Sequence, residues 1–278
     1  FAGSAGSTGS TDATGTSAKF KHPDGITSDG TNLYVVDQNN HTIRKIVIST
    51  GVVTTLAGSA GSTGSTDGTG TSARFHYPVG ITTDGTNLYV GDSSNHKIRK
   101  IVISTGVVTT FAGSSGGFAD GTGTAAKFNG PRGITTDGTN LYVTDANNHK
   151  IRKIVISTGV VTTVAGSGSQ GSTDGTGTSA TFNKPWGITT DGTNLYVSGI
   201  VNHLIRKIVI STGAVTTLAG SAGSTGSTNG TGTSATFNEP NGITTDGTNL
   251  YVADFSNYLI RKIALRGTLT ADVNLHNL

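Results

Sequence analysis

The chain has 278 residues, of which 42 are glycine, none is cysteine or methionine, and 13% are charged. Without cysteine it has no disulfide, thiolate metal site, iron–sulfur cluster or cysteine nucleophile, and no apolar run approaches the ~18 residues of a membrane-spanning helix. A net charge of +3 is too small for this length to indicate a nucleic-acid-binding surface.

A repeated segment, Asp-Gly-Thr-Asn-Leu-Tyr-Val, begins at Asp29, Asp84, Asp137, Asp191 and Asp246, at intervals of 53 to 55 residues. Because each copy lies among the same β-branched and aromatic blocks, the glycine excess does not indicate a disordered chain. We expect a single domain, 1–278, with repeat units at about 20–58, 75–113, 128–166, 182–220 and 237–278, joined by Gly/Ser/Thr-rich loops.

Each unit predicts four short strands in chain order. In the second unit they cover residues 80–83, 88–90, 98–103 and 107–111, separated by turns rich in Asp, Asn and Gly. The β-branched content favours strands, and no window has a sustained helical period. A single four-stranded unit cannot bury both of its faces, so neighbouring units must stack, as the blades of a β-propeller do.

The long loop after each fourth strand, for example residues 58–72, contains much of the excess glycine. Asp67 and Gly68 in this loop indicate a turn. Calcium is the alternative for the Asp-Gly-Thr-Gly loops, but each loop offers one carboxylate, whereas calcium takes six to eight oxygen ligands. We therefore favour a turn over a calcium site.

Three motifs follow one another in the units: Phe-x-x-Pro-x-Gly-Ile, Leu-Tyr-Val-x-Asp and Asn-His-x-Ile-Arg. This order resembles NHL repeats, and the resemblance covers all five units. It implies an all-β fold, a single β-propeller of five four-stranded antiparallel blades, with six blades as the alternative. The family includes scaffolds, ligand binders, RNA-binding domains and a zinc-dependent lyase branch, so the fold does not give the function.

Residues that recur in every unit are explained by the fold, and those that vary are candidates for function. All but three of the 16 acidic residues recur, and the exceptions are Asp24, Glu239 and Asp272. Four of the histidines recur as Asn-His, with Tyr258 in that place in the last unit, whereas His22, His76 and His276 do not. For the recurring Arg near a recurring Asp we expect a structural ion pair, with a basic nucleic-acid-binding stripe as the alternative.

The varying residues flank the repeat proline, follow the second strand or precede the third. In an antiparallel meander these places share one end of the sheet, and the first strand of each propeller blade lines the axis. We therefore predict a variable face that binds a ligand, with unconstrained drift at this end as the alternative. The face consists of Lys21, His22, Asp24, Gln38, His76, Tyr77, Val79, Arg132, Lys184, Trp186, Glu239, Asn241, Phe255 and Tyr258.

An aromatic anchor surrounded by Arg and Tyr suits recognition of a protein or a glycan. Trp186 is the single tryptophan and our preferred anchor, while Asp24 and Glu239 interrupt the positive charge that nucleic acid would need. We expect no enzyme activity and no cofactor, because no Ser–His–Asp set or phosphate loop is evident. The less favoured alternative is a zinc-dependent lyase-type enzyme, with a metal held by His22, His76 and Asp24.

A structural subunit of an extracellular oligomer or filament is the other alternative. Phe1-Ala-Gly matches the end of a fourth strand at residues 111–113. The segment from Thr268 either closes the ring with that N-terminus or donates a strand to a neighbouring molecule. The composition suggests an extracellular or cell-surface protein, the missing initiator Met a processed chain or fragment, and the near-identity of the units either natural duplication or consensus design. No signal peptide is visible.

Overall fold

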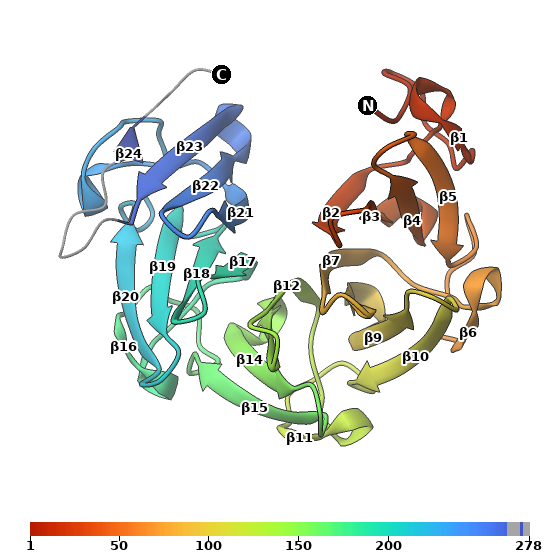
Figure 1. Ribbon diagram of the computed structural model, residues 1–278. Coiled ribbons are helices and arrows are strands. Elements are labelled where there is room, and N and C mark those ends of the chain that lie inside the picture. Colours follow the sequence, from red (N-terminus) through yellow and green to blue (C-terminus); the bar gives the residue numbers. More distant parts are fainter. Residues whose placement is uncertain (266–272, 275–278) are drawn as a thin grey trace. The chain divides into compact units, whose positions relative to one another are not determined.

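The computed structural model describes residues 1–265 and 273–274. In this part of the chain the protein is an all-β β-propeller with five blades, each an antiparallel sheet (Figure 1). Short 3-10 helices connect some of the strands, and no helix among the described residues is long and apolar enough to cross a membrane. The predicted fold class and number of blades are therefore confirmed.

Blades 1 and 2 repeat the same elements. Blade 1 contains β1 (Ala13–Thr14), η1 (Gly15–Ser17), β2 (Pro23–Ser28), β3 (Asn32–Asp37), η2 (Gln38–Asn40), β4 (Thr42–Val47) and β5 (Val52–Ala57). Blade 2 contains β6 (Gly68–Thr69), η3 (Gly70–Ser72), β7 (Pro78–Thr83), β8 (Asn87–Asp92), η4 (Ser93–Asn95), β9 (Lys97–Val102) and β10 (Val107–Ala112).

The remaining blades follow the same order. Blade 3 contains β11 (Gly121–Thr122), η5 (Gly123–Ala125), β12 (Pro131–Thr136), β13 (Asn140–Asp145), η6 (Ala146–Asn148), β14 (Lys150–Val155) and β15 (Val160–Ala165). Blade 4 contains β16 (Gly175–Thr176), η7 (Gly177–Ser179), β17 (Pro185–Thr190), β18 (Asn194–Gly199), β19 (Leu204–Val209) and β20 (Ala214–Ala219). Blade 5 contains η8 (Gly232–Ser234), β21 (Pro240–Thr245), β22 (Asn249–Asp254), η9 (Phe255–Asn257), β23 (Leu259–Ala264) and β24 (Val273–Asn274).

The prediction of four strands per blade was wrong for blades 1 to 4, whose sheets have five. The additional strand comes from the glycine-rich loop that precedes each blade. In blade 1, β1 pairs with β5 through Ala13↔Val53 and Thr14↔Val52. A two-residue strand with so many small neighbours has no pattern of alternating side chains, so the sequence did not reveal it.

The turns at the other end of the blades are fixed by a repeated carboxylate. In blade 2, Asp84 Oδ1 accepts the N–H groups of Thr86 at 2.9 Å and Asn87 at 2.6 Å, and Tyr89 donates its hydroxyl to Asp84 Oδ2 at 3.0 Å. Burial raises the pKa of Asp84, but these hydrogen bonds outweigh it and lower the pKa below its ordinary value. The predicted Asp-Gly-Thr-Asn turn is thus locked by its own side chains.

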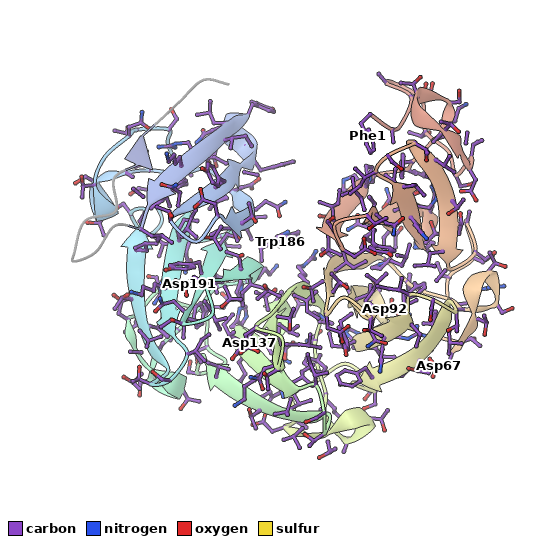
Figure 2. All side chains as sticks on the ribbon, viewed as in Figure 1. Phe1, Asp67, Asp92, Asp137, Trp186 and Asp191 are labelled. Atoms are coloured by element: carbon purple, nitrogen blue, oxygen red, sulfur yellow. The ribbon has the colours of Figure 1, made fainter. Side chains whose placement is uncertain are left out.

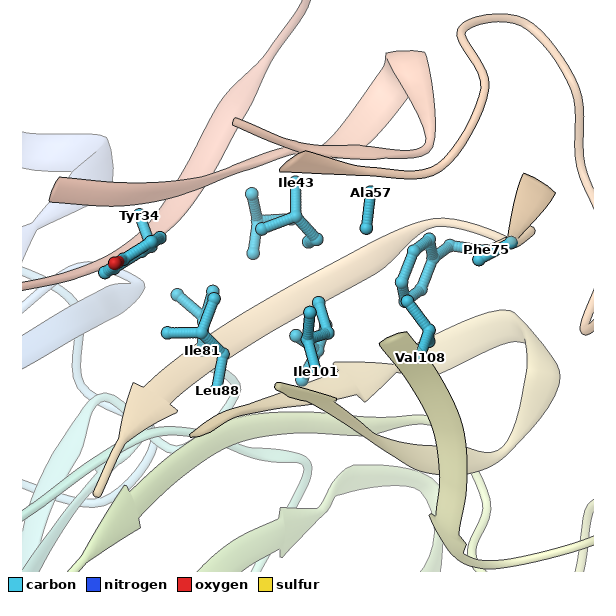
Figure 3. Close-up of a cluster of buried hydrophobic side chains, with 11 residues drawn as sticks. Tyr34, Ile43, Ala57, Phe75, Ile81, Leu88, Ile101 and Val108 are labelled. Atoms are coloured by element: carbon cyan, nitrogen blue, oxygen red, sulfur yellow. The ribbon is translucent and has the colours of Figure 1, made fainter. Parts of the chain in front are cut away.

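The chain divides into two compact units, and the boundary falls within blade 3. Unit 1 contains Phe1–Ile134 and Ile156–Val161, and unit 2 contains Thr135–Val155 and the described residues from Thr162 onward. In unit 1, apolar residues from blades 1 and 2 form one core, in which Tyr34 and Ile43 pack with Phe75, Ile81 and Leu88 (Figure 3). Stacking of neighbouring blades therefore builds the core, as the repeat predicted.

Candidate functional site

The residue before the repeat proline has the same unusual backbone conformation in all five blades. Its φ is 59° at His22, 47° at Tyr77, 64° at Gly130, 48° at Lys184 and 55° at Glu239. A left-handed conformation is uncommon for residues other than glycine, and the following proline disfavours compact conformations further. A residue keeps this conformation only where contacts with its surroundings stabilise it. The backbone that bears these four non-glycine side chains is therefore fixed.

The repeated histidines supply that restraint from the preceding blade. The Nδ1 atom of His41 accepts the N–H of Tyr77 at 3.2 Å, and His149 and His203 accept those of Lys184 and Glu239 at 3.1 Å each. Nδ1 must be unprotonated to accept, so these imidazoles bond as neutral rings. Burial lowers the pKa of His41, and the charges of His76 and Lys21 lower it further.

The residues after the proline lie next to one another in neighbouring blades. A Cβ atom at Gly25 would collide with the carbonyl oxygen of Val79, and one at Gly80 would collide with that of Arg132. In unit 2, a Cβ atom at Gly187 would likewise collide with the carbonyl oxygen of Asn241. Glycine at this position thus lets the inner strands approach closely, and it brings the variable residues into two rows. The rows are Asp24, Val79 and Arg132 in unit 1, and Trp186 and Asn241 in unit 2 (Figure 2 labels Trp186).

Opposite charges face each other along the row in unit 1. Burial raises the pKa of the Asp24 carboxyl, while the positive charges of His22 and Arg132 act against this rise. Burial lowers the pKa of the Arg132 guanidinium, and the charge of Asp24 opposes that change. Gln38 Nε2 also donates to Asp24 Oδ2 at 3.1 Å. Val79, between the two charges in the row, is only 4% exposed. It therefore offers a ligand very little surface, although the sequence placed it on the face.

Three aromatic rings gather where blades 1 and 2 meet. The ring centroid of His41 lies 4.8 Å from that of Tyr77 and 5.9 Å from that of His76, both edge-on, and the rings of His76 and Tyr77 are 5.2 Å apart. Tyr77 remains 44% exposed. Because His41 recurs as part of the Asn-His motif, the comparison between units assigned it to the fold and not to the variable face. It lies in the same connection between strands as Gln38, and this position could have identified it as part of the face.

The face in unit 2 is more apolar. Phe255 is 60% exposed and Tyr258 is 94% exposed, and Lys184 also lies at the surface. Glu239 is held in place because its Oε2 atom accepts the hydroxyl of Ser256 at 2.6 Å. Thr144 donates its hydroxyl to the carbonyl oxygen of Trp186 at 2.7 Å, which fixes the backbone from which the indole projects.

The repeated Arg forms the expected structural ion pairs. Arg44 is fully buried, and its Nη1 and Nη2 atoms lie 2.9 Å from Asp37 and 2.6 Å from the loop residue Asp12. The guanidinium also lies over the ring of Phe20, 4.9 Å from its centroid. The prediction of an ion pair is confirmed, and this pair fastens the glycine-rich loop to its blade.

The structure assigns the loop carboxylates a role other than calcium binding. In blade 2, Asp67 bonds Arg99 and also accepts the N–H and hydroxyl of Thr110 at 3.0 Å each. Within residues 1–265 and 273–274, no three His, Cys, Asp or Glu side chains come together as metal ligands would. His22, His76 and Asp24 are therefore not assembled into the three-ligand zinc site that we considered.

The terminal segment is described only in part. Val273 and Asn274 pair with Ile263 and Lys262 of their own blade, in the register that Val53 and Thr54 have with Ile46 and Lys45 in blade 1. At the N-terminus, the N–H of Gly3 donates to the carbonyl of Gly15 at 3.0 Å, as Gly58 does to Gly70. Thr268, Asp272 and His276 lie outside the described residues.

Comparison with known proteins gives relatives that match most of this chain. NHL repeat-containing protein 2 of Homo sapiens is 29% identical over 292 residues, which cover 88% of this chain and 39% of that protein. The protein from Bos taurus is 28% identical over 294 residues, covering 89% and 39%. The chain is a homologue of NHL repeat-containing proteins. The resemblance seen in the motifs is thereby confirmed, although no family model matches the chain.

The NHL-like chain spans about two fifths of these relatives or less. Protein SUPPRESSOR OF QUENCHING 1, chloroplastic, of Arabidopsis thaliana is 30% identical over 284 residues, covering 95% of this chain but 27% of that protein. The activities of the whole relatives therefore do not transfer to the NHL-like chain by similarity alone.

Solved structures with the same fold have varied functions. A chain of a nidogen/laminin complex has a TM-score of 0.64 at 19% identity, over 91% of this chain and 80% of that chain. An auxiliary nutrient binding protein from Bacteroides thetaiotaomicron has a TM-score of 0.59 at 19% identity, over 87% and 69%. Virginiamycin B lyase from Staphylococcus aureus has a TM-score of 0.54 at 17% identity, over 90% and 69%. At these identities the likeness shows the fold alone, and the fold includes both binding proteins and an enzyme.

Proposed function

We propose that this NHL-like chain is a non-enzymatic binding propeller that engages a protein or glycan partner through its variable face. The observation that carries the proposal is the contrast between a fixed backbone and diverse side chains. The left-handed residue before each proline recurs in every blade, and in neighbouring blades a histidine bonds the N–H of that residue. Rigid and repeated positions that present different side chains are what a binding surface with several subsites requires.

The chemistry of the two rows supports recognition rather than catalysis. The two carboxylates of the face accept hydrogen bonds, Asp24 from Gln38 and Glu239 from Ser256. These hydrogen bonds fix the orientation in which each carboxylate would meet a ligand. Trp186 and Arg132 are residue types that dominate binding energies at interfaces. The named neighbours include a nutrient binding protein and a chain from a protein complex, and both kinds of partner are consistent with this proposal. An extracellular location, proposed from the composition, would suit either.

Protein and glycan arrays probed with the unmodified chain, Trp186→Ala and Arg132→Ala test the proposal. We expect each substitution to weaken binding by at least about tenfold, since truncation of a hot-spot residue costs about 2 kcal/mol or more. Thr193→Ala, which changes an exposed turn at the other end of blade 4, is the matched control and should bind normally. Unchanged binding by both Trp186→Ala and Arg132→Ala would show that the site is wrong.

A second candidate function is a subunit of an oligomer, and the exposure of the first and last blades favours it. Ile26 of blade 1 is 58% exposed and Ile260 of blade 5 is 65% exposed. Apolar surface of this kind often marks an interface between proteins. Sedimentation velocity over a wide range of concentrations tests this candidate, and a single monomer species throughout would exclude it.

A further inference from the structure

Each blade except the fourth buries an aspartate at the end of its second long strand. In blade 2, Asp92 is fully buried and accepts three donors. These are the N–H of His76 at 2.8 Å, Asn95 Nδ2 at 2.8 Å and Arg99 Nη1 at 2.9 Å. The carboxylates of Asp37, Asp145 and Asp254 bond the Arg of their own blades in the same way. The three donors therefore form a cradle shaped for one carboxylate.

Blade 4 keeps the residues of this cradle but not the carboxylate. Gly199 stands at the end of β18, where the other blades have aspartate, while Asn183, Asn202 and Arg206 occupy the donor positions. Arg206 is only 2% exposed, and its Nη1 atom donates to the carbonyl of Thr181 at 3.0 Å without the second, charged acceptor that Arg99 has. Asn202 Nδ2 donates to the carbonyl of Gly171 at 2.6 Å, but blade 4 has no carboxylate corresponding to Asp92.

A small cavity lies where the carboxylate would be. Its volume is about 10 Å³, and its lining includes Asn183, Pro185, Gly199, Asn202 and Arg206. This is roughly the space of one water-sized group. A Cβ atom built on Gly199 would meet nothing closer than Leu204 O at 3.5 Å, so neighbouring side chains have not filled the space of the missing aspartate.

The charge balance of blade 4 also differs. Asp174 lies 2.8 Å from Arg206 Nη2, but its side chain is 48% exposed, whereas the carboxylate of Asp92 in blade 2 is fully buried. Burial lowers the pKa of Arg206, and the charge of Asp174 only opposes this change. A buried guanidinium with less than its full complement of acceptors is costly, so an anion that enters the cavity would stabilise the blade.

We propose that blade 4 is a binding site for formate, the smallest carboxylate anion, whose carboxylate takes the place of the missing aspartate carboxylate. Its two oxygens accept from Arg206 Nη1, from Asn202 Nδ2 and from the N–H of Asn183. Asn183 and Pro185 are adjacent in the sequence to Lys184 and Trp186, so the anion binds directly beside these two residues of the variable face. This site is independent of the proposed partner.

Thermal unfolding with increasing sodium formate, at constant ionic strength, tests the proposal. The midpoint of the unmodified chain should rise with formate concentration, because a ligand that binds only the folded state stabilises it. Gly199→Asp supplies the carboxylate covalently, so this variant should unfold at a higher temperature without formate and should bind formate at least about tenfold more weakly. Gly199→Ala, which places a Cβ atom in the space of the anion without adding a charge, should weaken the formate response but should not gain the stability expected of Gly199→Asp.

Two further measurements test whether formate binds at the position of the missing carboxylate. Asp92→Gly creates the same cradle in blade 2 and should acquire a second formate-dependent stabilisation. If that variant does not fold, titration of ¹³C-formate followed by NMR should show saturable binding to the unmodified chain but not to Gly199→Asp. Equal formate responses of the unmodified chain and Gly199→Asp would overturn the site, and an equal response to sodium chloride would overturn its preference for carboxylate.

Discussion

Blade 2 and the two end blades use equivalent residues in different surroundings. Phe75 and Leu88 of blade 2 are fully buried, whereas Phe20 and Leu33 at the same positions of blade 1 are only partly buried. Ile81 is 6% exposed and its counterpart Ile26 is 58% exposed. At the other end of the repeat, Ile98 has no exposed surface while Ile260 of blade 5 is 65% exposed.

This difference shows that a blade cannot bury the two faces of its own sheet. The strands within a blade satisfy one another's backbone groups, but the flat faces of the sheet need a neighbouring blade to exclude water. The cluster that joins blades 1 and 2 contains Ile43 from one and Phe75 and Ile81 from the other. The same side chain is therefore a core residue in blade 2 and a surface residue in an end blade, which gives matched pairs of substitutions.

The largest expected effect is on the repeated phenylalanine. Phe75→Ala removes a fully buried ring that lies under Arg99, 5.1 Å from its guanidinium carbon, and should lower the free energy of unfolding by about 3–5 kcal/mol. Phe20→Ala should cost clearly less, because that ring is already partly in water. Urea denaturation followed by circular dichroism measures both, and equal losses would contradict the comparison.

A smaller effect is expected at the repeated isoleucine of the third long strand. Ile98→Ala should destabilise the chain by about 2–5 kcal/mol, because it leaves a cavity in a closed core. Ile260→Ala should change the free energy of unfolding by less than about 1 kcal/mol, since most of that side chain is exposed already. A loss at Ile260 as large as that at Ile98 would mean that another surface covers blade 5.

The smallest expected effect is a dependence on pH that comes from His41 of blade 1. The pKa of His41 is lowered below its ordinary value of 6.5, first by burial and then by the charges of His76 and Lys21. The neutral ring is favoured in the folded state, so its stabilisation is complete above about pH 6.5 and is lost as the pH falls through the lower folded value. In blade 5 a tyrosine, Tyr258, takes the place of this histidine, and it is 94% exposed.

Unfolding free energies between pH 7.5 and 5 measure this dependence. His41→Gln keeps an acceptor for the N–H of Tyr77 but cannot be protonated in this range, so stability should fall less steeply with acid in the variant. Tyr258→Gln is the matched control and should leave the slope unchanged. A slope that is the same in His41→Gln and the unmodified chain would show that His41 does not contribute.

Much of the fold could be predicted because the repeat makes local signals consistent. The ends of the four long strands of blade 2 lie within two residues of the ranges expected from the sequence, since β-branched runs and Asp-Gly turns mark them directly. The short strand β6 could not be predicted, because it depends on pairing with β10 and on Arg99 reaching Asp67. Of the candidate site, the variable positions could be found by comparing units, but the burial of Val79 and the contact of His41 with Tyr77 depend on a neighbouring blade.

The five blades, their long strands and the ion pair between the repeated Arg and a repeated Asp could be inferred from the sequence alone, because residues within one repeat set all of these. The tertiary structure determines how deeply each repeated residue is buried and which residues it contacts. In the sequence, Gly199 is one of many differences between the repeats. Only the structure shows that this glycine leaves a cavity beside the buried charge of Arg206. The physical reason is that desolvation and close packing depend on what a neighbouring segment covers, and a repeated sequence does not encode that for any single copy.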